Sequence, residues 1–171
     1  MKLLTLIRHA KANPAEPGQP DFLRTLSDRG RRDAPKMGKH LKTHHQFSPD
    51  TLIASPAARA LATARCIAQE IGRQSPTMVQ EERIYEAPVE DLLEVLQEVE
   101  DRVEHACLVG HNPGMERLTN WLAGKRVVEG FVTCGVAMLE LNIDSWEILR
   151  GGCGTLRHYL QPRTLWNVNE D

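Results

Sequence analysis

An arginine and a histidine stand together at the end of a short apolar segment near the start of the chain. The stretch "LIRHAKA" (residues 6–12) passes from apolar residues into Arg8, His9 and Lys11. An arginine fork matches the oxygens of phosphate or carboxylate, and a neighbouring imidazole can act as base, nucleophile or ligand. A strand end capped by solvated charges explains the stretch equally well. An anion site is therefore one of two interpretations of these residues alone.

Two further segments place the same residue types at comparable positions. Arg59 follows Ser55 and Pro56 in "SPAARALATA", and His111 ends the run "CLVGH". Arg59 falls in the first turn of a predicted helix, where free N–H groups and the helix dipole favour an anion. Because ligands of parallel sheets bind beyond the carboxyl ends of the strands, we expect Arg8, His9, Arg59 and His111 to converge in one crevice.

Alternating strands and helices are needed to position these four groups. Short apolar runs predict strands at residues 3–7, 51–54, 107–109 and 136–141. One-sided or alanine-rich segments predict helices at about residues 28–45, 57–71, 90–99 and 113–122. The predicted fold class is α/β, with three layers (α/β/α), a mainly parallel central sheet, helices on both faces and antiparallel edges after residue 136.

Capping residues mark the expected ends of these helices. Ser27 is the expected N-cap of the first helix, although Pro35 leaves the course of its first turns open. Gly72 and Gly124 stand where the second and fourth helices should end.

Composition restricts the classes of function. The 171 residues suit a single domain, 1–171, with a few frayed residues at the C-terminus. The net charge of -2 and the absence of a basic, aromatic-rich run argue against nucleic acid as the main partner. No apolar stretch approaches a membrane span, and no signal-peptide pattern opens the chain, so we expect a cytoplasmic protein. Four cysteines without a CxxC pair indicate reduced thiols that pack.

Phosphoryl transfer is the chemistry that two arginines and two histidines around one oxyanion suit best. The chain has no Walker-type GxxxxGK[ST] motif, and "GGCG" (residues 151–154) is interpreted as a turn. No cysteine stands in a CxxxxxR loop. His9 is therefore the candidate nucleophile, since a neutral imidazole can attack phosphorus in line and carry the phosphoryl group covalently.

Three motifs, "LIRHAKA", "SPAARALATA" and "LVGHNPG" in this order, resemble those of the histidine phosphatase superfamily, also called the phosphoglycerate mutase-like family. The short chain and the segment "RTLSDRGRRDA" are similar to its small SixA-type phosphohistidine phosphatase branch. The resemblance spans residue 3 to about residue 122, and Ala10 stands where many members have glycine. It implies a phosphoglycerate mutase-like fold, a phosphorylated His9, a phosphate pocket of Arg8, Arg59 and His111, and no metal or organic cofactor.

The proton donor is less clearly marked than the nucleophile. Larger family members use an acidic residue after the third strand, and Glu86 in "RIYEAPVED" lies in the comparable region. Glu90 and Asp91 are rivals whose alternative role is helix capping. A phosphohistidine needs less acid catalysis than an ester because its leaving group is an imidazole nitrogen, so the donor can also be absent.

Two further cations have an open assignment. Lys11 either contacts the incoming phosphate or is solvated. Arg24 either reaches the pocket rim or forms an ion pair with Asp21 or Asp28.

The function predicted from the sequence is a metal-independent phosphohistidine phosphatase acting on a phosphorylated protein through His9. The alternatives are a phosphatase of small phosphate esters and a non-catalytic phosphate-binding module. We expect phosphate or sulfate to bind in the pocket. The cluster of Arg29, Arg31 and Arg32 is either a solvated helix start or a patch that steers an acidic partner.

Overall fold

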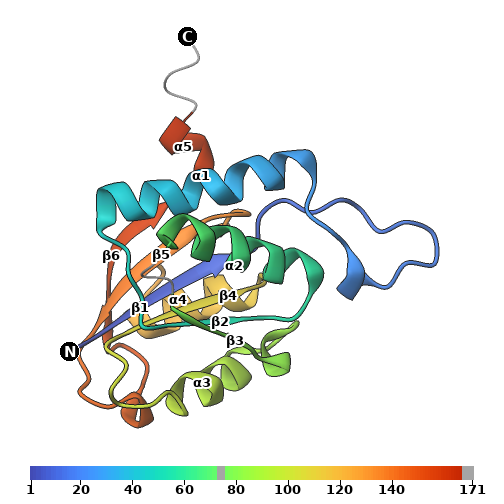
Figure 1. The fold of residues 1–171 in the computed structure, drawn as a ribbon. Helices are drawn as coiled ribbons and strands as arrows, with labels where there is room; N and C mark the ends of the chain where they lie inside the picture. The colour runs from blue at the N-terminus through green and yellow to red at the C-terminus, as the bar shows by residue number, and fades with distance from the viewer. Residues whose placement is uncertain (73–75, 167–171) are drawn as a thin grey trace.

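A six-stranded sheet forms the centre of the computed structural model, which describes residues 1–72 and 76–166 (Figure 1). Its strands are β1 (Lys2–Arg8), β2 (Thr51–Ala54), β3 (Thr77–Gln80), β4 (His105–Gly110), β5 (Val136–Leu141) and β6 (Gly154–Leu160), in the order β3-β2-β4-β1-β5-β6. Strands β3, β2, β4 and β1 are parallel, whereas β5 is antiparallel to β1 and β6. The predicted sheet, mainly parallel with antiparallel strands after residue 136, is confirmed.

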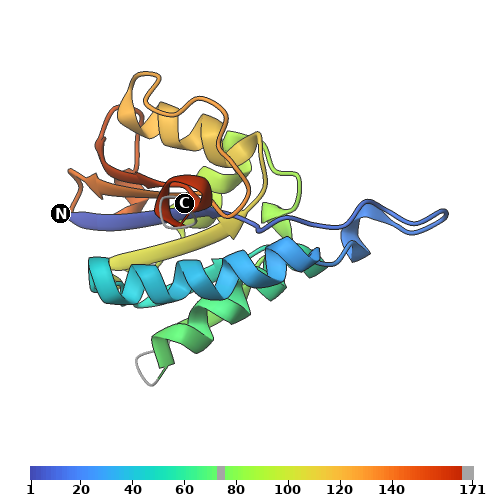
Figure 2. The same cartoon turned by 90° about the horizontal axis from the view of Figure 1, so that it is seen from above.

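Helices cover both faces of the sheet, which confirms the three layers (Figures 1 and 2). On one face lie α1 (Asp28–His45) and α2 (Ala58–Ile71), and on the other α3 (Val89–Gln97) and α4 (Gly114–Ala123). The short α5 (Pro162–Trp166) lies beside α1. None of the described helices is long and apolar enough to cross a membrane.

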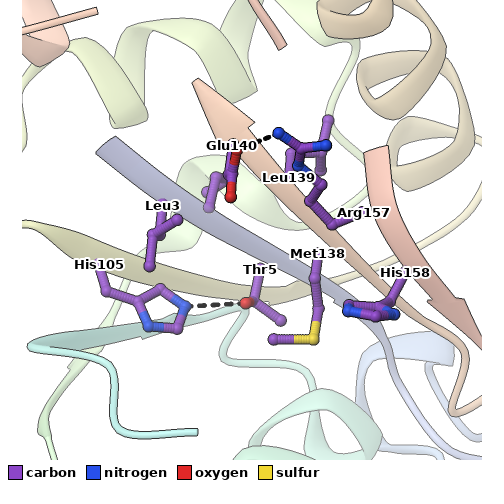
Figure 3. Close-up of a pocket in the computed structure, with 9 residues that line it drawn as sticks. Leu3, Thr5, His105, Met138, Leu139, Glu140, Arg157 and His158 are labelled. Atoms are coloured by element: carbon purple, nitrogen blue, oxygen red, sulfur yellow. Dashed lines mark hydrogen bonds and ion pairs between the residues drawn. The ribbon is translucent and has the colours of Figure 1, made fainter. Parts of the chain in front are cut away.

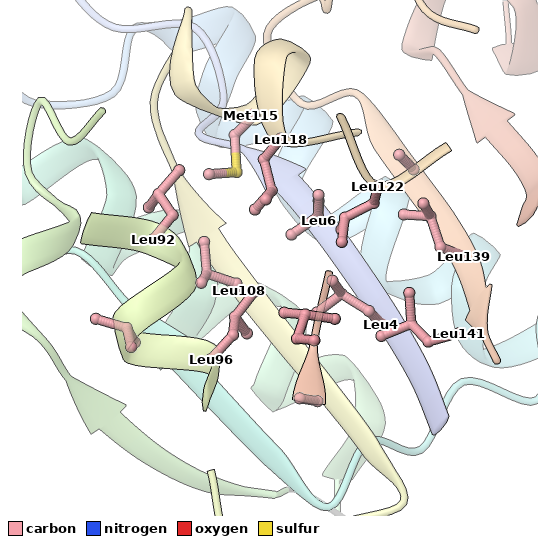
Figure 4. Close-up of a cluster of buried hydrophobic side chains, with 14 of the residues drawn as sticks. Leu4, Leu6, Leu92, Leu96, Leu108, Met115, Leu118, Leu122, Leu139 and Leu141 are labelled. Carbon is pink, nitrogen blue, oxygen red and sulfur yellow. The ribbon is translucent and has the colours of Figure 1, made fainter. Parts of the chain in front are cut away.

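Strand alternation creates an apolar core on each side of the sheet. Leu4 and Leu6 of β1 face α3 and α4, where Leu96 and Leu118 pack against them (Figure 4). Ile7 of the same strand belongs to the other core, with residues of α1 and α2 that include Met37, Leu41 and Ile67. The two cores fix β1 between the helical layers, so the residues at its carboxyl end have a defined position.

The predicted helix boundaries are close to those of the structure. The Ser27 hydroxyl accepts a hydrogen bond from the Gly30 N–H at 3.2 Å, which caps α1. Gly72 and Gly124 follow α2 and α4 with positive φ values of 75° and 68°. Pro35 lies inside a continuous α1, because the buried apolar face of the helix outweighs the single hydrogen bond that proline removes.

Strand β3 was not predicted. It has four residues at the edge of the sheet, three of them exposed, so it carries no run of buried apolar residues. Its pairing with β2 depends on long-range contacts that a local pattern does not contain.

The segment between β1 and α1 extends away from the rest of the molecule (Figure 2). Its base is closed by a bridge between Ala12 and Leu26 and by the Asn13 N–H, which donates to the Thr25 carbonyl at 2.9 Å. We call this segment, residues 9–27, the arm, and it contains a short 3-10 helix, Asp21–Leu23. The predicted fraying at the C-terminus concerns residues 167–171, which lie outside the described residues.

Candidate active site

Three neighbouring strands bring the predicted site residues together. Arg8 is the last residue of β1 and His9 follows it, while His111 follows β4 and Arg59 is the second residue of α2, after β2. Because β2, β4 and β1 are adjacent and parallel, their carboxyl ends meet. All four side chains line one cavity of about 230 Å³.

The proton of the His9 imidazole is assigned by its contacts. Nδ1 lies 2.8 Å from the Ala10 carbonyl oxygen, which can only accept, so Nδ1 carries the hydrogen. Nε2 receives a hydrogen bond from Arg59 Nε at 3.3 Å. Burial, with added effects of Arg59, Arg8 and Arg24, lowers the pKa of His9 to about 4. At neutral pH the imidazole is therefore neutral, with a lone pair on Nε2.

A carboxylate from the arm holds Arg59 in place. Arg59 is 5% exposed and donates through its two terminal nitrogens to the Asp21 carbonyl oxygen at 2.8 Å and to Asp21 Oδ2 at 2.9 Å. Asp21 also accepts from the Tyr85 hydroxyl at 2.6 Å and from Arg24 Nη1 at 2.9 Å. These donors, Tyr85 first, hold the pKa of Asp21 well below its usual range, so the carboxylate is ionised. The remaining Nε–H of Arg59 is directed to His9.

His111 is packed between His9 and Tyr85, with ring centroids 5.2 Å and 5.4 Å away. Its Nε2 is 2.8 Å from the Ser55 hydroxyl. Burial, together with the neighbouring His9 and Arg59, lowers the pKa of His111 to about 3. His111 is therefore also neutral near pH 7.

Two buried nitrogens of the site, Arg8 Nε and His111 Nδ1, have no hydrogen-bond partner within the described residues. Arg8 donates through Nη1 to the Phe131 carbonyl at 2.8 Å. A buried donor left without a partner costs about 1–3 kcal/mol. Both residues line the cavity, where a bound oxyanion would accept from Arg8 Nε, and from His111 Nδ1 in the tautomer that carries its hydrogen there.

Backbone contacts fix the turn that carries His9. The N–H of Ala10 donates to the Thr63 hydroxyl of α2 at 3.0 Å, and the N–H of Cys134 lies 3.1 Å from the carbonyl oxygens of both Arg8 and His9. Ala10 is fully buried and does not have a positive φ. Alanine therefore fits at the position where many family members have glycine.

The other predicted residues occupy different places. Lys11, Arg24 and Glu86 also line the cavity, and Arg24 makes the predicted ion pair with Asp21 as well. Glu86 is exposed and has a φ of 50°, in the left-handed region. Glu90 and Asp91 lie in the first turn of α3 and are not among the described residues that line the cavity.

Sequence reasoning missed the role of Asp21 toward Arg59 and the contribution of Tyr85. Asp21 was considered only as a partner for Arg24, three residues away. Its contact with Arg59 joins residues separated by 38 positions, which no local spacing reveals. The position of Tyr85, directly before Glu86, was the one available signal.

A larger cavity, of about 330 Å³, crosses β4, β1, β5 and β6 near the amino end of β1 (Figure 3). His105 Nε2 is 2.9 Å from the Thr5 hydroxyl there, and Arg157 forms an ion pair with Glu140 at 2.6 Å. Four of its polar side chains are thus already paired with each other. Within the described part of the chain, no three histidine, cysteine, aspartate or glutamate side chains gather to hold a metal ion.

Residues 4–116 match the model of the histidine phosphatase superfamily, branch 1. The chain belongs to this superfamily. It is 30% identical over 166 residues to the uncharacterized protein Rv1276c of Mycobacterium tuberculosis, covering 92% of this chain and 100% of that protein. The superfamily that the three motifs resembled is therefore confirmed.

Solved structures share the histidine phosphatase fold over nearly the whole chain. A structure assigned to the phosphohistidine phosphatase SixA of Agrobacterium tumefaciens has 28% identity and a TM-score of 0.81, and covers 94% of this chain and 98% of that one. The protein histidine phosphatase SixA complexed with tungstate has 20% identity and a TM-score of 0.79, covering 95% and 99%. The phosphoglycerate mutase-like fold predicted from the sequence is confirmed.

Proposed function

We propose that this histidine phosphatase superfamily member removes phosphoryl groups from phosphohistidine on a protein, through a covalent phosphohistidine at His9. The observation that carries the proposal is the unprotonated Nε2 of His9, which lies 3.3 Å from Arg59 Nε in a cavity also lined by Arg8 and His111. A neutral nucleophile among fixed cations suits attack on an anionic phosphoryl group. In this proposal residues 1–171 act as one domain, which the shared sheet of β1 and β6 supports.

In the first step, the lone pair of His9 Nε2 attacks phosphorus in line, and the bond from phosphorus to the leaving nitrogen breaks. Arg8 and Arg59 hold the equatorial oxygens and neutralise their charge. The Nδ1–H of His9 stays on the Ala10 carbonyl, which stabilises the positive charge that the ring acquires. His111 donates through Nδ1 in the tautomer in which the Ser55 hydroxyl donates to Nε2.

In the second step, water attacks the phosphorus of the phosphorylated His9, the P–N bond breaks, and inorganic phosphate leaves with the neutral imidazole restored. The leaving imidazole of the substrate takes one proton in the first step, and the attacking water gives up one in the second. Glu86, which lines the cavity, is our candidate to donate the proton of the first step and to accept the proton of the second.

The site favours a protein substrate over a small one. Lys11 and Glu86 at the cavity are exposed, so the cavity is accessible to a side chain presented by another protein. The fold likeness to proteins described as phosphohistidine phosphatases supports the same substrate class. Four unpaired cysteines, all in the described part of the chain, fit a reducing, cytoplasmic location.

Two other functions fit the same residues less well. A phosphatase of small esters needs an acid to protonate an alkoxide, and here the candidate is a single exposed glutamate. A phosphate-binding module has no need of a neutral histidine whose Nε2 lies unprotonated at the anion site.

The test is a turnover assay on a phosphohistidine-bearing protein domain and on a panel of small phosphate esters, with a chelator present throughout. His9→Ala is the loss-of-nucleophile variant, and His44→Ala, an exposed histidine of α1, is the matched control. We expect turnover of phosphohistidine in the wild type and the control, and a loss of at least about 10⁴-fold in His9→Ala.

Each alternative has its own outcome. Preference for an ester would assign the protein to small-molecule substrates and make Glu86→Gln the next variant. Absence of turnover on either substrate, with tungstate or phosphate still bound, would support the binding module. Full hydrolysis by His9→Ala would contradict the mechanism.

A further inference from the structure

A second hollow, distinct from the catalytic cavity, lies between α1 and α5, and we call it the α1–α5 pocket. It has a volume of about 340 Å³, and α1 lines it with Arg29, Arg32, Asp33 and Lys36 while α5 contributes Arg163 and Trp166. The four residues of α1 are spaced three and four apart, which places them on one face of the helix. Figure 1 shows α5 lying beside the middle of α1.

Positive charge in this pocket exceeds negative charge. Asp33, with a side chain 9% exposed, forms an ion pair with Arg29 at 3.4 Å. Within residues 1–72 and 76–166, Arg32, Lys36 and Arg163 form no ion pair with a carboxylate. Several other surface arginines are paired, as Arg157 is with Glu140. Clustered unpaired cations repel each other, and an anionic ligand removes that repulsion.

Trp166 gives the pocket an apolar wall. The Lys36 ammonium lies 5.7 Å from the centroid of its indole ring, within cation–π range. Arginine and tryptophan are enriched at the energetic centres of protein interfaces, and an arginine fork binds a carboxylate through two parallel hydrogen bonds. These residue types fit the acidic side chains of a protein better than an isolated small anion.

The pocket is physically connected to the turn that carries His9. The Ser27 N–H and hydroxyl donate to the Lys11 carbonyl at 2.8 Å and 3.1 Å, so the first turn of α1 rests on the segment that follows His9. From Gly30 to Lys36 the helix rises roughly 9 Å. A protein interface of ordinary size buries about 800 Å² on each partner and therefore reaches both places at once.

We propose that the α1–α5 pocket binds acidic side chains on the surface of the phosphorylated protein whose phosphohistidine enters the catalytic cavity. This inference rests on the proposed function, because it assumes a protein substrate. A substrate as small as phosphoramidate cannot reach from His9 to the pocket. Arg29, Arg32, Lys36 and Arg163 thus contribute to choice of partner and rate of association, and leave the chemical step unchanged.

The first experiment uses the double variant Arg32→Glu/Lys36→Glu in the full chain. Its matched control is Lys125→Glu/Arg150→Glu, at a corner where the loop after α4 meets the turn before β6, on the opposite face of the sheet. We expect kcat/KM for the phosphohistidine protein to fall at least roughly 10-fold in the α1 variant and to change little in the control. Turnover of phosphoramidate should be equal in all three proteins. Equal turnover of the phosphoprotein by both variants overturns the inference.

The second experiment does not depend on turnover. A fluorescein-labelled hexaglutamate peptide is titrated with each protein in saturating inorganic phosphate, which occupies the catalytic cations, and binding is followed by anisotropy. We expect the wild type and the control to bind and Arg32→Glu/Lys36→Glu to bind at least roughly 10-fold more weakly. Peptide binding that survives charge reversal overturns the α1–α5 pocket as an acidic-partner site. A third outcome is that charge reversal abolishes peptide binding while the wild type does not turn over phosphohistidine. This outcome contradicts the proposed function alone and retains the α1–α5 pocket as an acidic-partner site.

Discussion

His9 is held in one tautomer and one charge state by two hydrogen bonds and by burial. The Ala10 carbonyl fixes the hydrogen on Nδ1, Arg59 donates to Nε2, and burial disfavours the imidazolium ion. As the proposed nucleophile, His9 therefore needs no general base to remove a proton from Nε2. Its readiness to react is a property of the folded protein before substrate arrives.

This state of His9 is directly observable by NMR. In long-range ¹H–¹⁵N spectra, Nδ1 should carry the proton at neutral pH, and the ring should titrate with a midpoint of about 4. Added phosphate should raise that midpoint, because an anion stabilises the charged ring. A midpoint near the ordinary value of about 6.5, or a proton on Nε2, would contradict the assignment.

We expect Asp21 to act on the proposed reaction through its contact with Arg59. In Asp21→Asn, the charge-assisted contact at 2.9 Å becomes a neutral one, which weakens the orientation of Arg59 toward His9, while the bond from Arg59 to the Asp21 backbone carbonyl remains. We expect kcat/KM to fall about 10- to 100-fold, the equivalent of one such hydrogen bond of about 1.5–3 kcal/mol. The measurement is steady-state kinetics of Asp21→Asn, of Arg59→Lys and of the double variant.

The double variant separates positioning from an independent role. If Asp21 acts through Arg59, its loss should matter much less once Arg59 is replaced, so the two effects will not add. Effects that add fully would show that Asp21 contributes by another route.

Residue types and spacing predicted most residues of the candidate site, but not the residues that orient them. Arg8, His9, Arg59 and His111 could be singled out because each stands at or shortly after the end of an apolar strand, and the topology then brings the strand ends together. Asp21 and Tyr85 could not, because their contacts cross the arm, α2 and the segment after β3. The residues that orient a site are recognised by contacts, and those exist only after folding.

At the scale of elements, the close approach of α1 to the catalytic turn is the most sensitive contact. A Cβ at Gly30 would lie 2.1 Å from the Lys11 carbonyl oxygen, so this position admits no side chain without movement of one backbone. We expect Gly30→Ala to reduce the free energy of unfolding by roughly 1–3 kcal/mol and to lower kcat/KM, because the displaced backbone is continuous with His9.

Thermal unfolding and turnover of Gly30→Ala check this expectation. Thr43→Ala, at an exposed position of the same helix, is the control and should match the wild type in both measurements. Wild-type turnover by Gly30→Ala would show that the first turn of α1 does not constrain the catalytic turn.

Secondary structure was predictable where buried positions give the sequence a recognisable pattern of apolar residues. The runs at β1, β2, β4 and β5 are apolar because these strands lie inside the sheet, and glycines mark the ends of α2 and α4. Strand β3 was not predicted because it lies at the edge of the sheet, where most of its side chains are exposed and can be polar. The arm was likewise not predictable, since its course depends on contacts with α2 and Tyr85.

At the scale of the whole molecule, three histidines, two of them buried and one half-buried, link stability to pH. Burial is the first cause that lowers the pKa of His9 and His105 to about 4 and that of His111 to about 3. In the unfolded chain these groups titrate near 6.5. Between those values the unfolded state binds more protons than the folded state, so the free energy of unfolding decreases as pH falls from about 6.5 to about 4.

Melting temperatures measured across that range test the linkage. We expect a decrease on the order of 10 °C between about pH 7 and about pH 4. His105→Gln, which lies away from the catalytic cavity, should show a shallower dependence than the wild type. A melting temperature that is constant or rises on acidification would contradict the lowered pKa values of these three histidines.

The central claim is that His9 carries the phosphoryl group. The most direct measurement is to mix the enzyme with a phosphohistidine protein, quench within milliseconds into base, where phosphohistidine is stable, and locate the modified peptide by mass spectrometry. The account predicts a transient phosphoryl group on the peptide that contains His9, present in wild type and absent in His9→Ala. Turnover without any phosphorylated His9, or a phosphoryl group on another residue, would contradict it.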